Sequence, residues 1–142
     1  MAYFSTYTLW NLFIMKTFST LLIFTGLLLS SFVTQSGIDE VIGALRAGNV
    51  SDLSKFIDES VEISLPEKSD SYSKAQAVII LKDFFSNNGV KSFDVKHKGD
   101  QGDGQFCIGT LQTRSGSYRT TVFMKMKGNK QIVREIRFQT LE

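Results

Sequence analysis

The sequence predicts an α+β domain in which N-terminal helices pack on a curved, mainly antiparallel sheet. Three β-segments follow one another in the last third of the chain, at Gly104–Thr113, Ser117–Lys127 and Gln131–Thr140, separated by short turns at 114–116 and 128–129. Apolar residues with helical spacing occur upstream of them. The chain has 142 residues, 42% hydrophobic and 21% charged, which is the size and composition of one globular domain. Helices segregated to one face of an antiparallel sheet define the α+β class.

Residues 1–36 predict a secretory signal peptide. They carry one charge, Lys16, followed by the apolar run Phe18–Leu29 and small or polar residues. Met15 is a second candidate start, and cleavage is expected between Thr34 and Gly37. An uncleaved anchor is the alternative, but the apolar run of 12 residues is shorter than the roughly 20 that a span needs. The domain 37–142 is therefore expected in the periplasm or outside the cell, with membrane contact only through an uncleaved segment.

The first elements are predicted from spacing. A short helix, ended by Gly48-Asn49, follows from an apolar stripe of Ile38, Val41, Ile42 and Leu45. A second short helix, capped by Asn49 or Ser51, would bury Leu53, Phe56 and Ile57. Strict alternation predicts a half-buried strand at Ser60–Leu65, which Pro66 ends, and the polar stretch Glu67–Ser71 is expected to be a loop.

A long helix is predicted from about Lys74 to Asn87. Ser73 and Gln76 have the spacing of a capping box, and the apolar face comprises Ala77, Val78, Leu81, Phe84 and Phe85. Asn88-Gly89 leads into a strand in which Phe93, Val95 and His97 share one face and Asp94 lies on the other. The loop Gly99–Gly104 then joins this strand to the three-strand meander.

The register of the meander follows from the lengths of its turns. If Ser115-Gly116 and Gly128-Asn129 are two-residue loops, Phe123 lies opposite Ile108 on one side and Arg134 on the other. One face then carries Phe106, Ile108, Phe123, Ile132, Ile136 and Phe138, with Arg134 among them. The other carries Cys107, Leu111, Val122, Met124 and Val133, with Glu135 and Arg137. We expect the helices to cover the aromatic face; a one-residue slip would exchange the faces. Because both faces are partly apolar, the second is also expected to be covered.

Several stretches carry a resemblance to a known family. They are Ile38–Ile42, Ser71–Gln76, Lys82–Phe85, Phe106–Leu111, Tyr118–Thr120 and Arg134–Phe138. They resemble the exported bacterial family called domain of unknown function 4783, and the element order resembles the nuclear-transport-factor-2-like (cystatin-like) fold. The resemblance implies a cone-shaped α+β domain with a pocket between helices and sheet. It implies no particular activity, because this fold hosts enzymes, binding modules and dimerisation domains.

The candidate ligand-binding residues are Arg134, His97, Phe123 and Phe138. In the expected register Arg134 lies on the helix-covered side, where a guanidinium needs an internal carboxylate such as Glu62 or Asp83, or a ligand anion. His97 is the only histidine, and without a partner to orient it we interpret it as structural rather than as a general base. Phe123 and Phe138 would line the same cavity.

The sequence offers no catalytic, metal or cofactor motif. Asp100 and Asp103 hint at calcium, but no glutamate closes the loop at the required spacing. The lone Cys107 cannot form an internal disulfide and is expected to be a buried apolar residue. Export and the lack of aromatic residues among the lysines argue against nucleic acid as a partner.

Charge separates the domain into halves. Residues 37–89 carry 5 basic and 9 acidic residues, and residues 90–142 carry 10 basic and 5 acidic.

Our leading hypothesis is a non-enzymatic module that dimerises through the outer sheet face and holds a small ligand in its cone. The alternatives are a pocket enzyme of the isomerase, dehydratase or hydrolase kind, using His97 or a buried carboxylate, and a protein that binds an anionic envelope component. The basic residues for that last role are Lys125, Lys127, Lys130 and Arg137.

Overall fold

The computed structural model describes residues 36–142, and Gln35–Glu142 form one compact unit. The predictions for the N-terminal segment, including the start at Met15, fall outside the described residues. The elements are α2 (Gly37–Ala47), α3 (Val50–Ser54), β1 (Ser60–Leu65), β2 (Lys68–Ser73), α4 (Lys74–Asn88), β3 (Val90–Gln101), β4 (Gly104–Thr113), β5 (Gly116–Lys127) and β6 (Lys130–Leu141). No helix within residues 36–142 is both long and apolar enough to cross a membrane.

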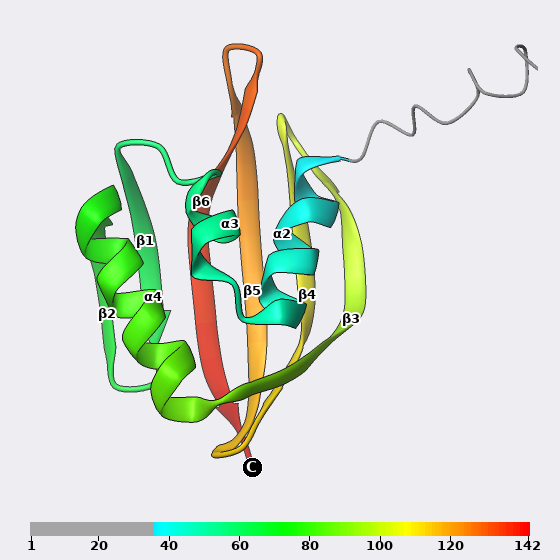
Figure 1. Cartoon of the computed structure of the whole chain (residues 1–142). Coiled ribbons are helices and arrows are strands. Elements are labelled where there is room, and N and C mark those ends of the chain that lie inside the picture. The colour runs from blue at the N-terminus through cyan, green and yellow to red at the C-terminus, as the bar shows by residue number, and fades with distance from the viewer. Residues whose placement is uncertain (1–35) are drawn as a thin grey trace, which may run out of the picture. The chain divides into compact units, whose positions relative to one another are not determined.

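The strands form one open sheet in the order β2-β1-β6-β5-β4-β3. Neighbouring strands are antiparallel except β1 and β6, which pair in parallel. The helices lie on one face of the sheet, with α4 against β1 and β2 and α2 against β3 and β4 (Figure 1). The predicted α+β class, with helices on one face of a mainly antiparallel sheet, is confirmed. We call the face away from the helices the outer face.

The helix ends follow the predicted local chemistry. Gly48 ends α2 with a φ of 61°, a left-handed conformation that glycine adopts without a steric cost. Asn49 caps α3 by accepting a hydrogen bond of 3.1 Å from the amide of Asp52. Ser73 and Gln76 form the capping box that starts α4: the Ser73 hydroxyl accepts from the Gln76 amide at 3.4 Å, and the Gln76 carbonyl oxygen accepts from the Ser73 amide at 3.2 Å.

The stretch predicted to be a loop at Glu67–Ser71 is a strand from Lys68 onward, and there the prediction was wrong. Pro66 and Glu67 make a two-residue turn, because Leu65 pairs directly with Lys68. β2 then runs antiparallel to β1 as an edge strand whose side chains are exposed except for the half-buried Tyr72. A strand with almost no buried position carries no apolar alternation, so its sequence resembles that of a loop. The predicted loop Gly99–Gly104 is likewise shorter, since β3 continues to Gln101 and β4 begins at Gly104.

Of the two predicted turns of the meander, one is confirmed and the other is shifted by one residue. Gly128-Asn129 is the predicted two-residue loop, since Lys127 pairs with Lys130. At the other turn the loop is Arg114-Ser115, because Thr113 pairs with Gly116, so Phe106 rather than Ile108 lies opposite Phe123. This slip moves the pairing by two positions, and side chains alternate with period two. It therefore changes partners without exchanging the faces of β4 and β5.

A β-bulge in β6 overturns the predicted helix-covered face. Met124 pairs with Val133 and Phe123 with Glu135, which leaves Arg134 as the extra residue. Beyond this point the alternation of β6 is reversed, so Ile136 and Phe138 join the face that carries Cys107, Leu111 and Val122. These residues are buried in the core beneath the helices. Phe106, Ile108 and Phe123 are therefore on the outer face.

Candidate functional site

The structure separates the residues that the sequence nominated as ligand-binding. Phe138 is 1% exposed on the helix side, and its ring packs against those of Phe84 and Phe85 with centroids 4.5 and 6.1 Å apart. Phe123 and Arg134 lie on the outer face, where the first is half-buried and the second exposed. A ligand held between helices and sheet could not touch both groups, because the sheet lies between them.

His97 also lies on the outer face, which corrects the prediction that it shares a face with Phe93 and Val95. β3 contains a bulge at Lys96, since Val95 pairs with Gly109 and His97 with Ile108. The bulge also places Asp94 on the same face as His97, but the Asp94 carboxylate is ion-paired with Lys96. His97 itself is exposed. Exposure to solvent leaves the imidazole without the fixed partner that a general base requires.

Arg134 stands at the bulge of β6, and its position differs from the predicted one. It is exposed on the outer face and has no ion-pair partner within residues 36–142. Of its two predicted partners, Asp83 belongs to α4 on the helix side, whereas Glu62 lines the same surface hollow as Arg134. A bulge bends its strand and redirects the side chain of the extra residue. The bulge thus makes a guanidinium available at the outer surface.

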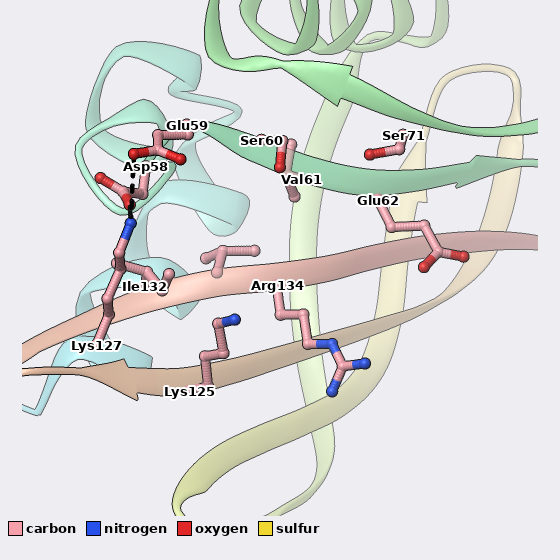
Figure 2. Close-up of a pocket in the computed structure, with 11 residues that line it drawn as sticks. Asp58, Glu59, Ser60, Val61, Glu62, Ser71, Lys125, Lys127, Ile132 and Arg134 are labelled. Atoms are coloured by element: carbon pink, nitrogen blue, oxygen red, sulfur yellow. Dashed lines mark hydrogen bonds and ion pairs between the residues drawn. The ribbon is translucent and has the colours of Figure 1, made fainter.

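The hollow that Arg134 lines lies where β1 and β6 diverge. The two strands pair only over Glu62–Ser64 and Glu135–Arg137. Before that point the Val133 amide donates to the carbonyl oxygen of Phe56 at 2.8 Å instead of to β1. The hollow has a volume of about 320 Å³. Figure 2 shows its polar lining: Asp58, Glu59, Ser60, Glu62 and Ser71 come from the β1–β2 side, and Lys125, Lys127 and Arg134 from the hairpin of β5 and β6.

The charges in this hollow are unevenly paired. Lys127 forms ion pairs with Asp58 and, at 3.6 Å, with Glu59. The hydrogen bond between Lys127 and Asp58 lowers the pKa of the Asp58 carboxyl and raises the pKa of the Lys127 ammonium. Lys125 and Arg134 have no carboxylate within ion-pair distance among residues 36–142. The hollow thus has three basic and three acidic residues, and Lys125, Arg134 and Glu62 are those without an ion pair among residues 36–142.

A second hollow of about 310 Å³ adjoins the first through shared residues. Lys125 and Arg134 line both, and the rest of the second hollow is lined by Gln101, Asp103, Gln105, Phe123, Met124 and Glu135. We call the two hollows together the outer groove. It places two cations between hydroxyl and carboxylate groups on the β1 side and an aromatic ring with amide groups on the β4 side.

Sequence reasoning identified the cations of the groove but missed the residues that face them. Ser60, Glu62 and Ser71 reach the groove through the pairing of β2 with β1 and the parallel pairing of β1 with β6. Of the basic residues proposed for an anionic partner, Lys127 and Arg137 are occupied by carboxylates, Arg137 by Glu135. The alternation at Ser60–Leu65 was the only signal for this wall, and it could not indicate which strand β1 would join.

Other reactive groups are accounted for elsewhere. Cys107 is fully buried, and burial raises the pKa of its thiol to about 11. Within residues 36–142, no cluster of three or more histidine, cysteine or acidic residues could hold a metal ion. Asp100 accepts a hydrogen bond of 3.2 Å from Gln105.

Comparison with known proteins places the domain in a family. Residues 38–139 match the family described as a domain of unknown function, DUF4783. The chain belongs to this family. A search of curated proteins found no match. The family assignment agrees with the resemblance seen in the sequence and names no activity.

Solved structures of DUF4783 proteins are similar to this DUF4783 domain. A protein from Bacteroides uniformis is 33% identical with a TM-score of 0.72, covering 75% of this chain and 99% of that chain. A protein from Bacteroides ovatus is 31% identical with a TM-score of 0.70, covering 72% and 94%. An NTF2-like protein of unknown function from Cytophaga hutchinsonii is 13% identical with a TM-score of 0.55, covering 78% and 95%. The last shows the fold alone, and the nuclear-transport-factor-2-like architecture is confirmed.

Proposed function

We propose that this DUF4783 domain is an exported, non-enzymatic binding module that forms a homodimer through the outer face of its sheet. The observation that carries the proposal is an apolar centre on that face. Phe106 and Phe123 pair across β4 and β5 with ring centroids 6.3 Å apart, and both rings are only half-buried within one copy. Ile108 lies beside them, also half-buried. Such a cluster gains free energy when a second apolar surface removes it from water.

The surroundings of this centre fit a second copy of the chain. Charges of both signs border it, including the exposed Arg119 and Asp94. An apolar centre with a polar, charged rim is the usual anatomy of a protein interface. A two-fold arrangement uses the same surface on both copies, so the apolar centre of one sheet can pack on that of the other. Export is supported by the apolar run Phe18–Leu29 behind Lys16.

The test is the oligomeric state of residues 36–142. This part folds as a unit, since one compact core spans it and the Bacteroides uniformis structure, 99% covered, corresponds to it. Light scattering after size exclusion should give a dimer at micromolar concentration. Ile108→Arg and Phe106→Glu should each give monomers, because a buried unpaired charge opposes association.

Ile79→Arg is the matched control for these substitutions. Ile79 is an apolar residue of α4 with 61% exposure, and it lies on the helix side of the sheet. The same charge placed there should leave the dimer intact. A monomer at all concentrations, or a dimer that survives both outer-face substitutions, would overturn the proposal.

A further inference from the structure

We propose that the hollow between β1 and β6 binds a small polyhydroxylated anion, a sugar acid or sugar phosphate. Lys125 and Arg134 would bind its carboxylate or phosphate, and Ser60, Ser71 and Glu62 its hydroxyl groups. The proposal concerns the end of the outer face near the β5–β6 turn and does not depend on the homodimer.

The first step is the charge of the hollow. Lys125 and Arg134 line it without an ion-pair partner among residues 36–142; of the three carboxylates in the lining, Asp58 and Glu59 are both paired with Lys127 and Glu62 is unpaired. Figure 2 shows the Lys125 and Arg134 side chains both extending over the outer surface of β5 and β6. Like charges that share a hollow repel each other, and a bound anion removes that repulsion. The planar guanidinium favours carboxylate and phosphate in particular, because it can donate two parallel hydrogen bonds to them.

The second step is the backbone that positions the guanidinium. The bulge gives up regular pairing between β5 and β6 at Arg134, although Met124–Val133 and Phe123–Glu135 are paired on either side. The divergence of β1 and β6 is held by the bond of 2.8 Å from Val133 to Phe56. The hollow is thus built by two departures from regular sheet that meet at one residue. Bulges are enriched beside functional sites for this reason.

The third step is the set of hydroxyl groups opposite the cations. On the outer side of β1 and β2, the Ser64 and Ser69 hydroxyls are bonded to each other at 2.8 Å. Ser60 and Ser71 lie on the same face but nearer the hollow, and their hydroxyls have no hydrogen-bond partner within residues 36–142. Glu62 lies directly opposite Ser71 and two positions after Ser60 on that face, and it has no ion pair within residues 36–142. Free hydroxyl donors beside a carboxylate acceptor match the alternating donors and acceptors of a sugar ring.

The size of the hollow fits one such ring. Its volume of about 320 Å³ is at the lower end of the range of small-molecule sites, roughly 300–1,000 Å³. Ile132, which pairs with Lys125 and is buried, contributes an apolar side chain, whereas the side chains of Val61 and Val133 belong to the core on the helix side. The rest of the lining is polar, which suits a ligand rich in hydroxyl groups, because each of them needs a hydrogen-bond partner when it leaves water.

To test this, residues 36–142 are titrated with glucuronate, glucose 1-phosphate, glucose and inorganic phosphate. Binding is detected by changes in amide chemical shifts in two-dimensional NMR spectra. The two sugar anions should bind and shift amides of β1 and of β6 around Arg134, and glucose and phosphate should bind at least tenfold more weakly. Arg134→Gln and Lys125→Gln should each weaken binding of the sugar anions by roughly tenfold or more, since each removes a charged hydrogen-bond donor.

Matched variants separate the two parts of the site. Lys130→Gln removes an exposed charge beside the same hairpin turn from a residue that does not line the hollow, and it should leave affinity unchanged. The double variant Ser60→Ala, Ser71→Ala should weaken the sugar anions but not phosphate. Titration of Ile108→Arg should give the wild-type affinity, whether or not the domain dimerises. Three results would each overturn the proposal: absence of binding at roughly 10 mM ligand, about ten times a 1 mM dissociation constant; equal binding of phosphate and sugar phosphate; or an unchanged affinity in Arg134→Gln.

Discussion

The rings of Phe84 and Phe138 lie with their centroids 4.5 Å apart and their planes inclined by 37°. This contact joins α4 to β6, and it exists because the bulge at Arg134 turns Phe138 toward the helices. Phe138 is 1% exposed, so its ring contributes to the core over its whole surface. A regular β6 would have placed it on the outer face with Phe123.

Replacement of Phe138 by alanine should therefore cost about 3–5 kcal/mol of unfolding free energy, the loss expected when a fully buried phenylalanine leaves a cavity. Phe123→Ala is the matched control on the outer face and should cost about 1 kcal/mol, since its ring is only half-buried. Urea unfolding of both variants at low protein concentration measures the difference. Equal losses would contradict the assignment of faces.

Replacement of glycine by alanine should have opposite effects on the stability of the domain at Gly104 and at Gly43. A Cβ on Gly104 would lie 1.9 Å from the carbonyl oxygen of Met124 and 3.2 Å from the Cα of Lys125, both backbone atoms that no rotamer change can move. Gly104→Ala should destabilise the domain by about 1–3 kcal/mol. Gly43 is exposed within α2 and has no atom within 4 Å of such a Cβ, so Gly43→Ala should stabilise by about 0.5–1 kcal/mol. Thermal unfolding followed by circular dichroism would show both, and a shift of the same sign in the two variants would refute the contrast.

Because of the ion pair of Asp39 with Lys98, we expect the unfolding free energy of the domain to depend on pH in the acidic range. The Lys98 ammonium donates to Asp39 at 2.7 Å, and this bond, with a further one from Ser36, lowers the pKa of the carboxyl below its usual 3.8. A carboxyl whose folded pKa is lowered contributes stability above pH 4, which is lost as pH falls through the folded pKa.

Lys98→Met should remove this contribution, by no more than about 1 kcal/mol because both side chains are largely exposed. The difference from the wild type in urea unfolding should be largest at pH 7 and shrink as the pH falls below about 4. Lys91→Met, an exposed lysine of β3 without an ion pair in the described part, is the control. A difference as large at pH 2.5 as at pH 7 would point to packing rather than charge.

The thiol of Cys107 should be unreactive in the folded domain. It is fully buried, and burial raises its pKa to about 11, so the reactive thiolate is scarce at neutral pH. Ellman's reagent at pH 8 should label it only as fast as the domain unfolds. In about 6 M guanidinium labelling should be immediate, because only hyperstable domains have unfolding midpoints above about 5 M. Rapid labelling without denaturant would contradict the buried position.

The sequence was sufficient for the features that depend on neighbours in the chain. The helix caps at Asn49 and Ser73 and the turn at Gly128-Asn129 are local chemistry, and each is confirmed. The faces of the meander were predicted wrongly because a bulge leaves no mark in an alternating strand: Ile132 and Ile136 continue the same period across Arg134. The wall of the candidate site depends on β2, which has no buried alternation, and on the parallel pairing of β1 with β6, which no local pattern encodes.

That parallel pairing also divides the domain mechanically. Strands β3 to β6 each pair with their neighbour in the chain, whereas Glu62 meets Glu135 about 70 positions away over a seam of only three residue pairs. Loop closure makes such a contact slow to form and, with so few hydrogen bonds, the first to yield. We expect β1, β2 and α4 to detach as one unit before the meander unfolds, after losing core contacts that include those of Phe138 with α4. The outer groove borders this seam on the side of Ser60 and Arg134, so it would widen whenever β1, β2 and α4 move away from β6.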